Sequence, residues 1–545
     1  MAMEPAVTSD PIRHVVLLIL ENHSFDQMLG CLKGIYPSME GVAPAEPREN
    51  QDDAGIFYRQ SPTTERQMFV DPHHELEHVA VQLENQNDGF VRDFVRAYPD
   101  STSLARNFIM GYYPLDFLPA LHALARHFTI CDHWFSSLPG PTWPNRFFAL
   151  TGTSHGRVNM PQDGQHLVDV KGWFEQDQDT IFDRLSEKAI DWKVYFQGIP
   201  QTVALCHQRR ALNAARYFYM GQFYDDARGA EEDFPQFCLI EPDFVGSGEN
   251  DDHPPHDIMK AQKLMADVYN ALRSNAALWE STLLVIIYDE HGGFYDHVVP
   301  PPAVPPDDHQ QEYTFDQYGL RVPAILVSPW VKREVNATLF DHTSVLKYLI
   351  DKWHLGPLGR RAAMANSIGI ALQTGMSLRD DTPVRINLTT QQLVPPDARA
   401  EDKAESTRSA HHIALGFLTH YLKVVVVENL PLFYTACARL LEGTKGLIQR
   451  WLSWFYKESP AIVVAVQPDK LARDKQPLRE QFAKFLGHQK PRALPALARI
   501  LRDPKVSNDQ RHHALRTLAV ITGRKFHREQ NGLVNADQWL KKYGY

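Results

Sequence analysis

Acidic and amide side chains follow two of the most apolar stretches of the chain. Glu21 and Asn22 come directly after the run HVVLLIL, and Asp289 and Glu290 come directly after LLVIIY. Acids brought within about 4 Å repel each other by about 4 kcal/mol at an effective dielectric near 20. They converge only if they are protonated or if a cation lies between them. Oxygen ligands suit hard divalent ions, and zinc also accepts carboxylates. The alternative is an ordinary polar turn at each strand end.

A hydroxyl group lies where it could act on phosphorus. Thr142 follows the turn-forming sequence LPGP and precedes the run from Phe147 to Thr151, which we expect to be helical. Thr142 then lies at or near a helix N-terminus, where N–H groups and the helix dipole favour a phosphoryl group. Threonine is also a preferred N-cap residue. The pattern leaves both roles open, a nucleophile and an N-cap.

A cation held by the acids would lower the pKa of the Thr142 hydroxyl and make it a nucleophile near neutral pH. Phosphoryl transfer also requires that the equatorial oxygens be neutralised, and Asn145 and Arg146 follow Thr142 in the same predicted helix. This combination favours hydrolysis of a phosphate ester.

Histidines supply candidate acids and phosphate ligands. Asp71-Pro72 is expected to open a helix that carries His74 and His78 on one face, a spacing found in metal sites and more often at plain surfaces. His253 and His256 lie in a polar loop. With His74, they could bind phosphate or protonate the leaving oxygen.

Buried strands must bring these groups together. The runs 14–20 and 283–287 lack polar alternation, which is typical of strands buried on both faces. In open α/β sheets, reactive groups lie outside the carboxyl ends of the strands. Neighbours along a strand point to opposite faces, and Gly292-Gly293 frees the backbone so that Asp289 and Glu290 can converge.

Strands alternate with helices from residue 12 to about 355, which predicts an α/β fold with a mostly parallel sheet covered on both faces. We expect a catalytic domain over residues 12–360, a linker or irregular segment over 361–410, and a helical C-terminal region over 411–545. Within that region, Pro491 to Gly523 looks like one HEAT-type helical hairpin.

Composition narrows the functional classes. The chain has 545 residues, which is enough for two to four domains, and its net charge of −10 argues against a nucleic-acid partner. Its five scattered cysteines form neither a disulfide framework nor a zinc-ribbon pattern. We see no signal peptide and no apolar run of about 20 residues. A cytoplasmic location is therefore expected, with export by a non-classical route as the alternative and transient contact with a membrane surface allowed.

Four segments resemble a known family. They are ENHSFD (21–26), GPTWPNR (140–146), YDEHGGFYDH (288–297) and DHTS (341–344), in the order found in the bacterial phospholipase C and acid phosphatase phosphoesterases. The resemblance covers about residues 12 to 355. It implies a three-layer α/β/α fold of the alkaline-phosphatase-like type. The segment Asp71-Pro72-x-His74 matches a further family element with an active-site histidine, and His253 and His256 match less closely.

The resemblance also implies one divalent metal ion, Zn²⁺, Ca²⁺ or Mg²⁺, held by Glu21, Asn22, Asp289 and Glu290 beside Thr142. Thr142 would be the nucleophile and form a phospho-threonine intermediate. The expected function is that of a phospholipase C acting on phospholipids, the alternative is an acid phosphatase acting on small phosphomonoesters, and a second alternative is an inactive protein that binds phosphate or lipid headgroups. The chain departs from many relatives in lacking a visible export signal and β-rich tails after residue 362.

Overall fold

A computed structural model describes residues 10–394, except 69, 163–164, 166, 210–212, 214–215, 246–247, 311 and 374–376, and also residues 410–421, 501–502 and 532–542. The chain divides into two compact units. Unit 1 comprises Met1–Met160 and Tyr224–Ser409, and unit 2 comprises Pro161–Phe223 and Ala410–Tyr545. Apart from residues 501–502, the expected HEAT-type hairpin lies outside the described residues.

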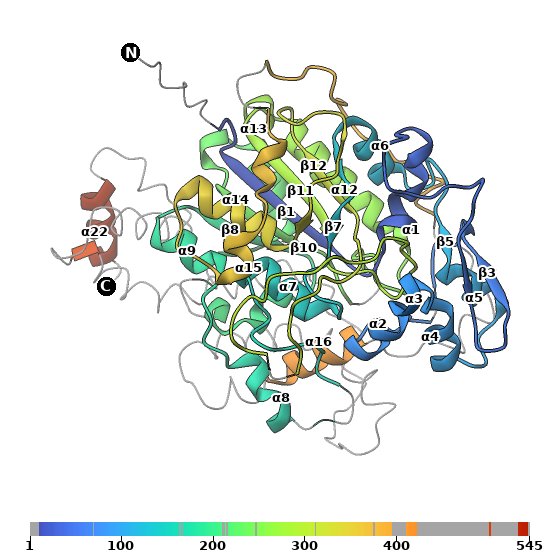
Figure 1. Ribbon diagram of the computed structural model, residues 1–545. Coiled ribbons are helices and arrows are strands. Elements are labelled where there is room, and N and C mark those ends of the chain that lie inside the picture. The colour runs from blue at the N-terminus through green and yellow to red at the C-terminus, as the bar shows by residue number, and fades with distance from the viewer. Residues whose placement is uncertain are drawn as a thin grey trace, which may run out of the picture. The chain divides into compact units, whose positions relative to one another are not determined.

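The strands of unit 1 form a sheet in the order β13-β6-β12-β11-β1-β10 (Figure 1). Strand β12 is antiparallel to both of its neighbours, and the remaining pairs are parallel, so the sheet is mostly parallel as predicted. The bounds are β1 His14–Leu20, β6 Thr129–Cys131, β10 Phe237–Glu241, β11 Thr282–Tyr288, β12 Ala324–Val327 and β13 Val335–Asn336.

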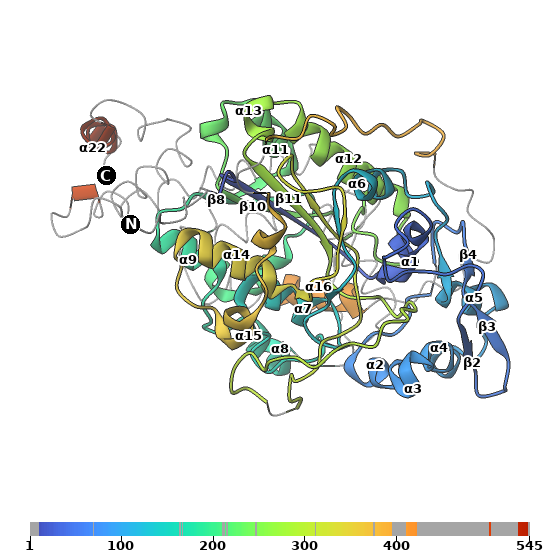
Figure 2. The same ribbon diagram turned by 45° about the horizontal axis from the view of Figure 1, so that its top comes forward.

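Helices cover both faces of this sheet, which gives three layers. Figures 1 and 2 show α6 and α12 beside one face and α7 and α14 beside the other. The helices of unit 1 are α1 Phe25–Leu29, α2 Leu76–Gln82, α3 Glu84–Asn87, α4 Phe90–Ala97, α5 Ser103–Ile109, α6 Pro119–His127, α7 Thr142–Thr151, α12 Ile258–Arg273, α13 Ala276–Trp279, α14 Thr343–Trp353 and α15 Gly359–Met364.

Short strand pairs and turns complete unit 1. Strands β2 (Glu49–Gln51) and β3 (Phe57–Arg59) pair in an antiparallel hairpin. The parallel pairs are β4 Ser61–Pro62 with β5 Gly111–Tyr112, and β7 Trp134–Phe135 with β14 Phe340–Asp341. The 3₁₀ helices are η1 Gly30–Gly34, η4 Glu231–Asp233 and η5 Ile368–Ala371.

Unit 2 is described in part. Its strands β8 (Trp192–Phe196) and β9 (Tyr217–Tyr219) pair in parallel, and helix α8 packs against α16. The Tyr421 hydroxyl of α16 donates a hydrogen bond to Glu175 Oε1 at 3.0 Å. The helices are α8 Leu167–Phe174, α9 Ile181–Glu187, η2 Gln201–Ala204, η3 Cys206–Arg209, α16 Ala410–Tyr421 and α22 Gly532–Lys542, and α11 (Met220–Arg228) contains the point where the chain passes into unit 1.

The neighbouring strands β1 and β11 position the acids. Every residue of both strands is buried, as the uninterrupted apolar runs predicted. The two strands pair in parallel from His14 opposite Thr282 to Leu20 opposite Tyr288. Glu21 and Asp289 are therefore the first residues past the same edge of the sheet, and Asp289 N donates to Leu20 O at 3.0 Å.

Candidate active site

Arg146 links the two acids that follow the central strands. Its Nε donates to Asp289 Oδ2 at 3.0 Å, and its Nη2 lies 3.0 Å from Glu21 Oε1. The Arg146 side chain is 4% exposed, and both carboxylates are fully buried. The sequence pattern suggested that Arg146 would contact phosphate, whereas in the structure it pairs with two of the expected metal ligands.

Asn22 has an amide whose orientation is fixed by His74. Asn22 Nδ2 donates to His74 Nε2 at 3.4 Å, while His74 Nδ1 donates to Pro72 O at 2.8 Å. The opposite atom, Asn22 Oδ1, is buried, and no described residue hydrogen-bonds to it. A buried carbonyl oxygen without a donor is unfavourable unless something outside the chain fills the position. The arrangement therefore leaves Asn22 Oδ1 available to a group from outside the chain.

Glu290 lies on a sharp bend. Its Oε2 accepts a hydrogen bond from Gly292 N at 2.6 Å, and its Oε1 is 3.7 Å from His74 Nε2, too far for a hydrogen bond. Gly292 and Gly293 have φ of +65° and +74°, so the chain does bend here as the glycine pair predicted. Glu290 Oε1 is a second buried oxygen for which the described residues provide no hydrogen bond.

Thr142 is the first residue of helix α7. Pro141 occupies the N-cap position and Thr142 makes no capping hydrogen bond, so Thr142 is not the N-cap and its role as a nucleophile stays a prediction. Thr142 is fully buried, and its Oγ1 has no hydrogen-bond partner in the described part of the chain. It lies one turn before Arg146 on the same helix face, where residues four apart have Cβ atoms about 5–6 Å from each other. Thr142 therefore extends from the same face of α7 as Arg146, which joins Glu21 and Asp289.

Asn145 serves the turn before the helix. Its Oδ1 accepts from Leu138 N at 3.1 Å, and its Nδ2 donates to Gly140 O at 2.7 Å and to Pro141 O at 3.2 Å. These contacts fix the loop that leads into Thr142. The Asn145 side chain therefore holds the loop that precedes Thr142, and its expected contact with phosphate stays a prediction.

The site carries excess negative charge. Glu21 and Asp289 are fully buried against the guanidinium of Arg146, and Glu290 is fully buried next to Asp289. Burial raises the pKa of Asp289 to about 6, although Arg146 opposes the shift. Burial and the charge of Asp289 raise the pKa of Glu290 well above its ordinary value. A divalent cation would reverse both effects, and the oxygens of Asn22, Thr142 and Glu290 that lack hydrogen bonds fit such an ion.

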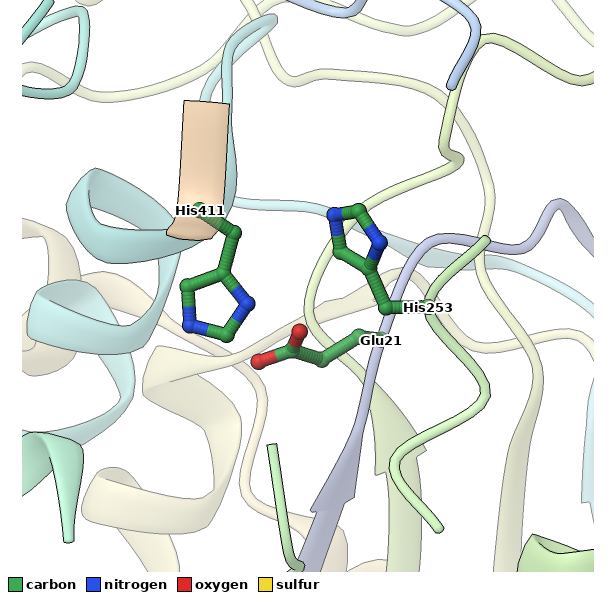
Figure 3. A group of neighbouring side chains, drawn as sticks. All are labelled: Glu21, His253 and His411. Atoms are coloured by element: carbon green, nitrogen blue, oxygen red, sulfur yellow. The ribbon is translucent and has the colours of Figure 1, made fainter. Parts of the chain in front are cut away.

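The predicted histidines lie beside these residues. Figure 3 shows Glu21 at the end of β1 and His253 as its neighbour on the loop after β10. His253 Nδ1 donates to Pro254 O at 2.5 Å, its Nε2 lies 3.8 Å from Asp71 Oδ2, and its ring centroid is 6.4 Å from that of His74. The third labelled residue, His411, belongs to unit 2, where it accepts a hydrogen bond from Gln201 Nε2 at 2.8 Å.

His256 is held by an acid that the sequence analysis did not single out. His256 Nδ1 donates to Asp251 Oδ1 at 2.5 Å, and burial lowers the pKa of His256 to about 4.

The expectation that His74 and His78 share one helix face was wrong. Helix α2 begins at Leu76 with Glu75 as its N-cap, so His74 precedes the helix and shares no helix face with His78.

Residues 12–356, which are more than half of the chain, match the model of the Phosphoesterase family. The chain belongs to the Phosphoesterase family. This finding confirms the resemblance seen in the sequence motifs and, at the level of the family, the expected hydrolysis of phosphoester bonds.

Two plant proteins are among the relatives of this phosphoesterase. Non-specific phospholipase C6 of Arabidopsis thaliana is 38% identical over 346 residues, which are 59% of this chain and 62% of that protein. Non-specific phospholipase C1 of the same plant is 31% identical over 440 residues, 74% of this chain and 78% of its own length. The alignment thus spans less than two-thirds of phospholipase C6. Among solved structures, an alkaline phosphatase superfamily protein from Vibrio parahaemolyticus matches at 10% identity with a TM-score of 0.27, over 46% of this chain and 64% of that chain.

The phosphoesterase site also uses His342, which the sequence placed in a motif but not in the site. His342 Nε2 donates to Asp289 O at 2.6 Å, and its Nδ1 accepts from Trp134 Nε1 at 3.3 Å. Burial lowers the pKa of His342 to about 4, so the ring is neutral and its two partners fix the tautomer. His342 therefore holds the backbone of Asp289. The pairing of β7 with β14 brings Trp134 beside Phe340, and predicting that pairing would have placed His342 near the site.

A membrane-spanning segment is not found in the described ranges, because none of their helices combines the necessary length with sufficient apolar character.

Proposed function

We propose that this phosphoesterase cleaves the phosphodiester bond of phospholipids in the manner of a phospholipase C, with Thr142 as the nucleophile. The observation that carries the proposal is the Thr142 hydroxyl. It is buried at the start of α7, it makes no capping hydrogen bond, and no described residue accepts from it or donates to it. Burying a hydroxyl without a hydrogen bond destabilises the fold. A reaction in which the hydroxyl acts as the nucleophile would explain why it is buried in this way.

We further propose that one divalent cation is bound by Glu21, Asn22, Asp289 and Glu290, with Thr142 completing the set. When bound, such an ion would lower the pKa of the Thr142 hydroxyl and offset charge on the phosphoryl oxygens. The residues of the chain supply the rest. Arg146 holds Glu21 and Asp289 in place. His342 fixes the Asp289 backbone, and His74 orients the amide of Asn22.

The proposed reaction has two steps. In the first, Thr142 Oγ1 attacks phosphorus, the bond from phosphorus to the glycerol oxygen breaks, and diacylglycerol leaves with a proton. In the second, water attacks the phospho-threonine diester, which releases the phosphorylated headgroup and restores the hydroxyl. His253 is the candidate for the proton donor, because its ring lies beside that of His74, at 6.4 Å between centroids, whereas both ring nitrogens of His74 already have partners.

The names of the relatives support a phospholipid substrate over a small monoester. Both plant proteins are called phospholipases C. The discriminating measurement is the product. Diacylglycerol released from phosphatidylcholine vesicles supports the proposal, whereas inorganic phosphate from an aryl phosphate, without diacylglycerol, supports an acid phosphatase.

The nucleophile is tested with Thr142→Val and Thr142→Ser. Valine keeps the shape of the side chain and removes the hydroxyl, so turnover should fall by about a thousandfold or more, as expected when a nucleophile is lost. Serine keeps the hydroxyl and should retain measurable activity. Rapid quenching followed by mass spectrometry should find the phosphorylated group on a peptide that contains Thr142.

The matched control is Thr151→Val at the other end of α7. Thr151 Oγ1 lies 3.0 Å from Phe147 O and 2.6 Å from Thr153 O, at the opposite end of the helix from Thr142. This variant should keep turnover within a few-fold of wild type. Equal turnover in wild type and Thr142→Val would remove Thr142 from the mechanism, whatever the substrate.

A further inference from the structure

A cluster of two histidines and one aspartate lies just past the C-terminal end of α7. His155, Asp307 and His309 each offer a ligand atom, and these atoms all lie within 4.8 Å of one another. Asp307 Oδ1 is 3.2 Å from His309 Nδ1. The two imidazole rings stack with their centroids 3.7 Å apart and their planes inclined by 28°. Two imidazoles and a carboxylate at this spacing match the ligand set of a transition-metal site.

The cluster is fixed by hydrogen bonds that do not use the candidate ligand atoms of the histidines. Thr153 Oγ1 accepts from His155 N at 2.8 Å and donates to Asp307 Oδ2. His309 N donates to Asp307 Oδ1 at 2.8 Å. Arg360 holds the same loop, because its backbone N donates to Pro306 O at 2.8 Å and its guanidinium donates to Asp307 O. These hydrogen bonds fix the Asp307 carboxylate and the backbone of the two histidines.

The cluster is open to solvent, unlike the candidate active site. The His309 side chain is 49% exposed and that of Asp307 is 22% exposed. Three protein ligands leave a coordination position for water, and imidazole ligands favour Zn²⁺ over Mg²⁺ or Ca²⁺.

We propose that His155, Asp307 and His309 bind one zinc-type transition-metal ion at a second site, separate from the candidate active site. Helix α7 has 10 residues, so its two ends are separated by about 15 Å. Thr142 begins this helix, and His155 lies three residues past Gly152, its C-cap. The ion would tie the loop that contains Asp307 and His309 to the end of the helix that carries Thr142. Its role is to stabilise that junction.

The experiment counts bound metal in the full chain. Protein freed of metal by chelation is equilibrated with Zn²⁺, separated from free ion and measured by elemental analysis. Relative to wild type, His309→Ala and Asp307→Asn should each lose one equivalent. His155 has φ of +55°, so His155→Asn is the appropriate third variant, because asparagine tolerates this conformation while its shorter side chain cannot reach the ion. Zn²⁺ should also raise the Tm of these variants less than that of wild type.

The control is His127→Ala. His127 is a partly exposed histidine of α6 whose Nδ1 donates to Ala123 O at 2.8 Å, and its removal should leave the zinc count unchanged. Asp289→Asn should lose the equivalent at the candidate active site and keep the one at His309, so the two sites fail independently. Equal zinc counts and equal Tm increases in wild type, His309→Ala and His155→Asn would overturn the proposal.

Discussion

The Arg321 guanidinium binds the Asp296 carboxylate with two hydrogen bonds, 2.9 Å from Nε to Oδ1 and 3.1 Å from Nη2 to Oδ2. The same Nη2 donates to Asp26 Oδ1 at 3.0 Å. Asp26 lies shortly after Asn22 and Asp296 shortly after Glu290, so Arg321 joins the two loops that carry the proposed metal ligands. All three side chains are almost completely buried.

Arg321→Met should therefore be severely destabilising. It leaves the buried Asp296 carboxylate without its cation and removes one ion-pair partner of Asp26, which also pairs with His297 at 2.7 Å. Breaking a buried ion pair on one side costs about 3–5 kcal/mol. Urea unfolding of wild type and variant measures the difference. Arg59→Met is the control, because Arg59 is 70% exposed in its pair with Glu49 and such surface pairs contribute about 1 kcal/mol or less. If Arg321→Met lowered the free energy of unfolding no more than Arg59→Met does, Arg321 would not stabilise the protein by joining the two segments.

Gly292→Ala should disrupt the position of Asn22. A Cβ atom at Gly292 would lie 2.2 Å from Asn22 O, and φ of Gly292 is +65°, which L side chains rarely adopt. The backbone of Asn22 must move, so the variant should bind divalent metal more weakly and lose most of its phosphoesterase activity. Gly34→Ala is the matched control, since an added Cβ there meets nothing within 4 Å. Equilibrium dialysis measures the metal affinity of Gly292→Ala and Gly34→Ala. An unchanged affinity in Gly292→Ala would count against Asn22 as a ligand.

The sequence predicted the central strands because burial on both faces leaves an uninterrupted apolar run, as in β1 and β11. It also predicted that acids would gather at the carboxyl edge, since parallel strands end together. It could not predict the partner of Arg146 or the existence of the Arg321 network. Arg321 and Asp26 are 295 positions apart, and no local pattern encodes a pairing between loops at that separation. The start of α2 was misjudged because proline near a helix start does not fix which residue is the N-cap.

Glu75 should stabilise the protein in a pH-dependent way. Its Oε2 accepts from His73 Nδ1 at 3.0 Å and from His74 N at 3.2 Å. Burial alone would raise the pKa of Glu75, but the hydrogen bond from His73 and the charges of His74 and His73 lower it from 4.5 to about 2. Because the folded-state pKa is depressed, the stabilisation is complete above pH 4.5 and is lost as the pH falls towards 2.

Glu75→Gln should accordingly lower the free energy of unfolding by about 3 kcal/mol at neutral pH, since each pKa unit corresponds to about 1.4 kcal/mol. The difference between wild type and variant should shrink as the pH falls from 4.5 to 3. Urea unfolding at several pH values measures it. A difference that stays constant over this range would show that the Glu75 carboxylate does not contribute through its charge.

Glu290→Gln should have opposite effects with and without metal. Glu290 is fully buried next to Asp289, and its Oε1 lacks a hydrogen bond from any residue in the described ranges, so without a cation its negative charge destabilises the fold. Glutamine has the same shape and no charge. Metal-free Glu290→Gln should therefore have a higher Tm than metal-free wild type, and saturating divalent metal should raise the Tm of wild type more than that of the variant.

Chelation should abolish turnover of wild type, and restoring the metal should recover it, while Glu290→Gln should require at least about tenfold more metal for the same turnover. Glu40→Gln is the control, because the Glu40 side chain is 52% exposed and lies outside the site. If metal raised the Tm of wild type and Glu290→Gln equally, Glu290 would not be a ligand.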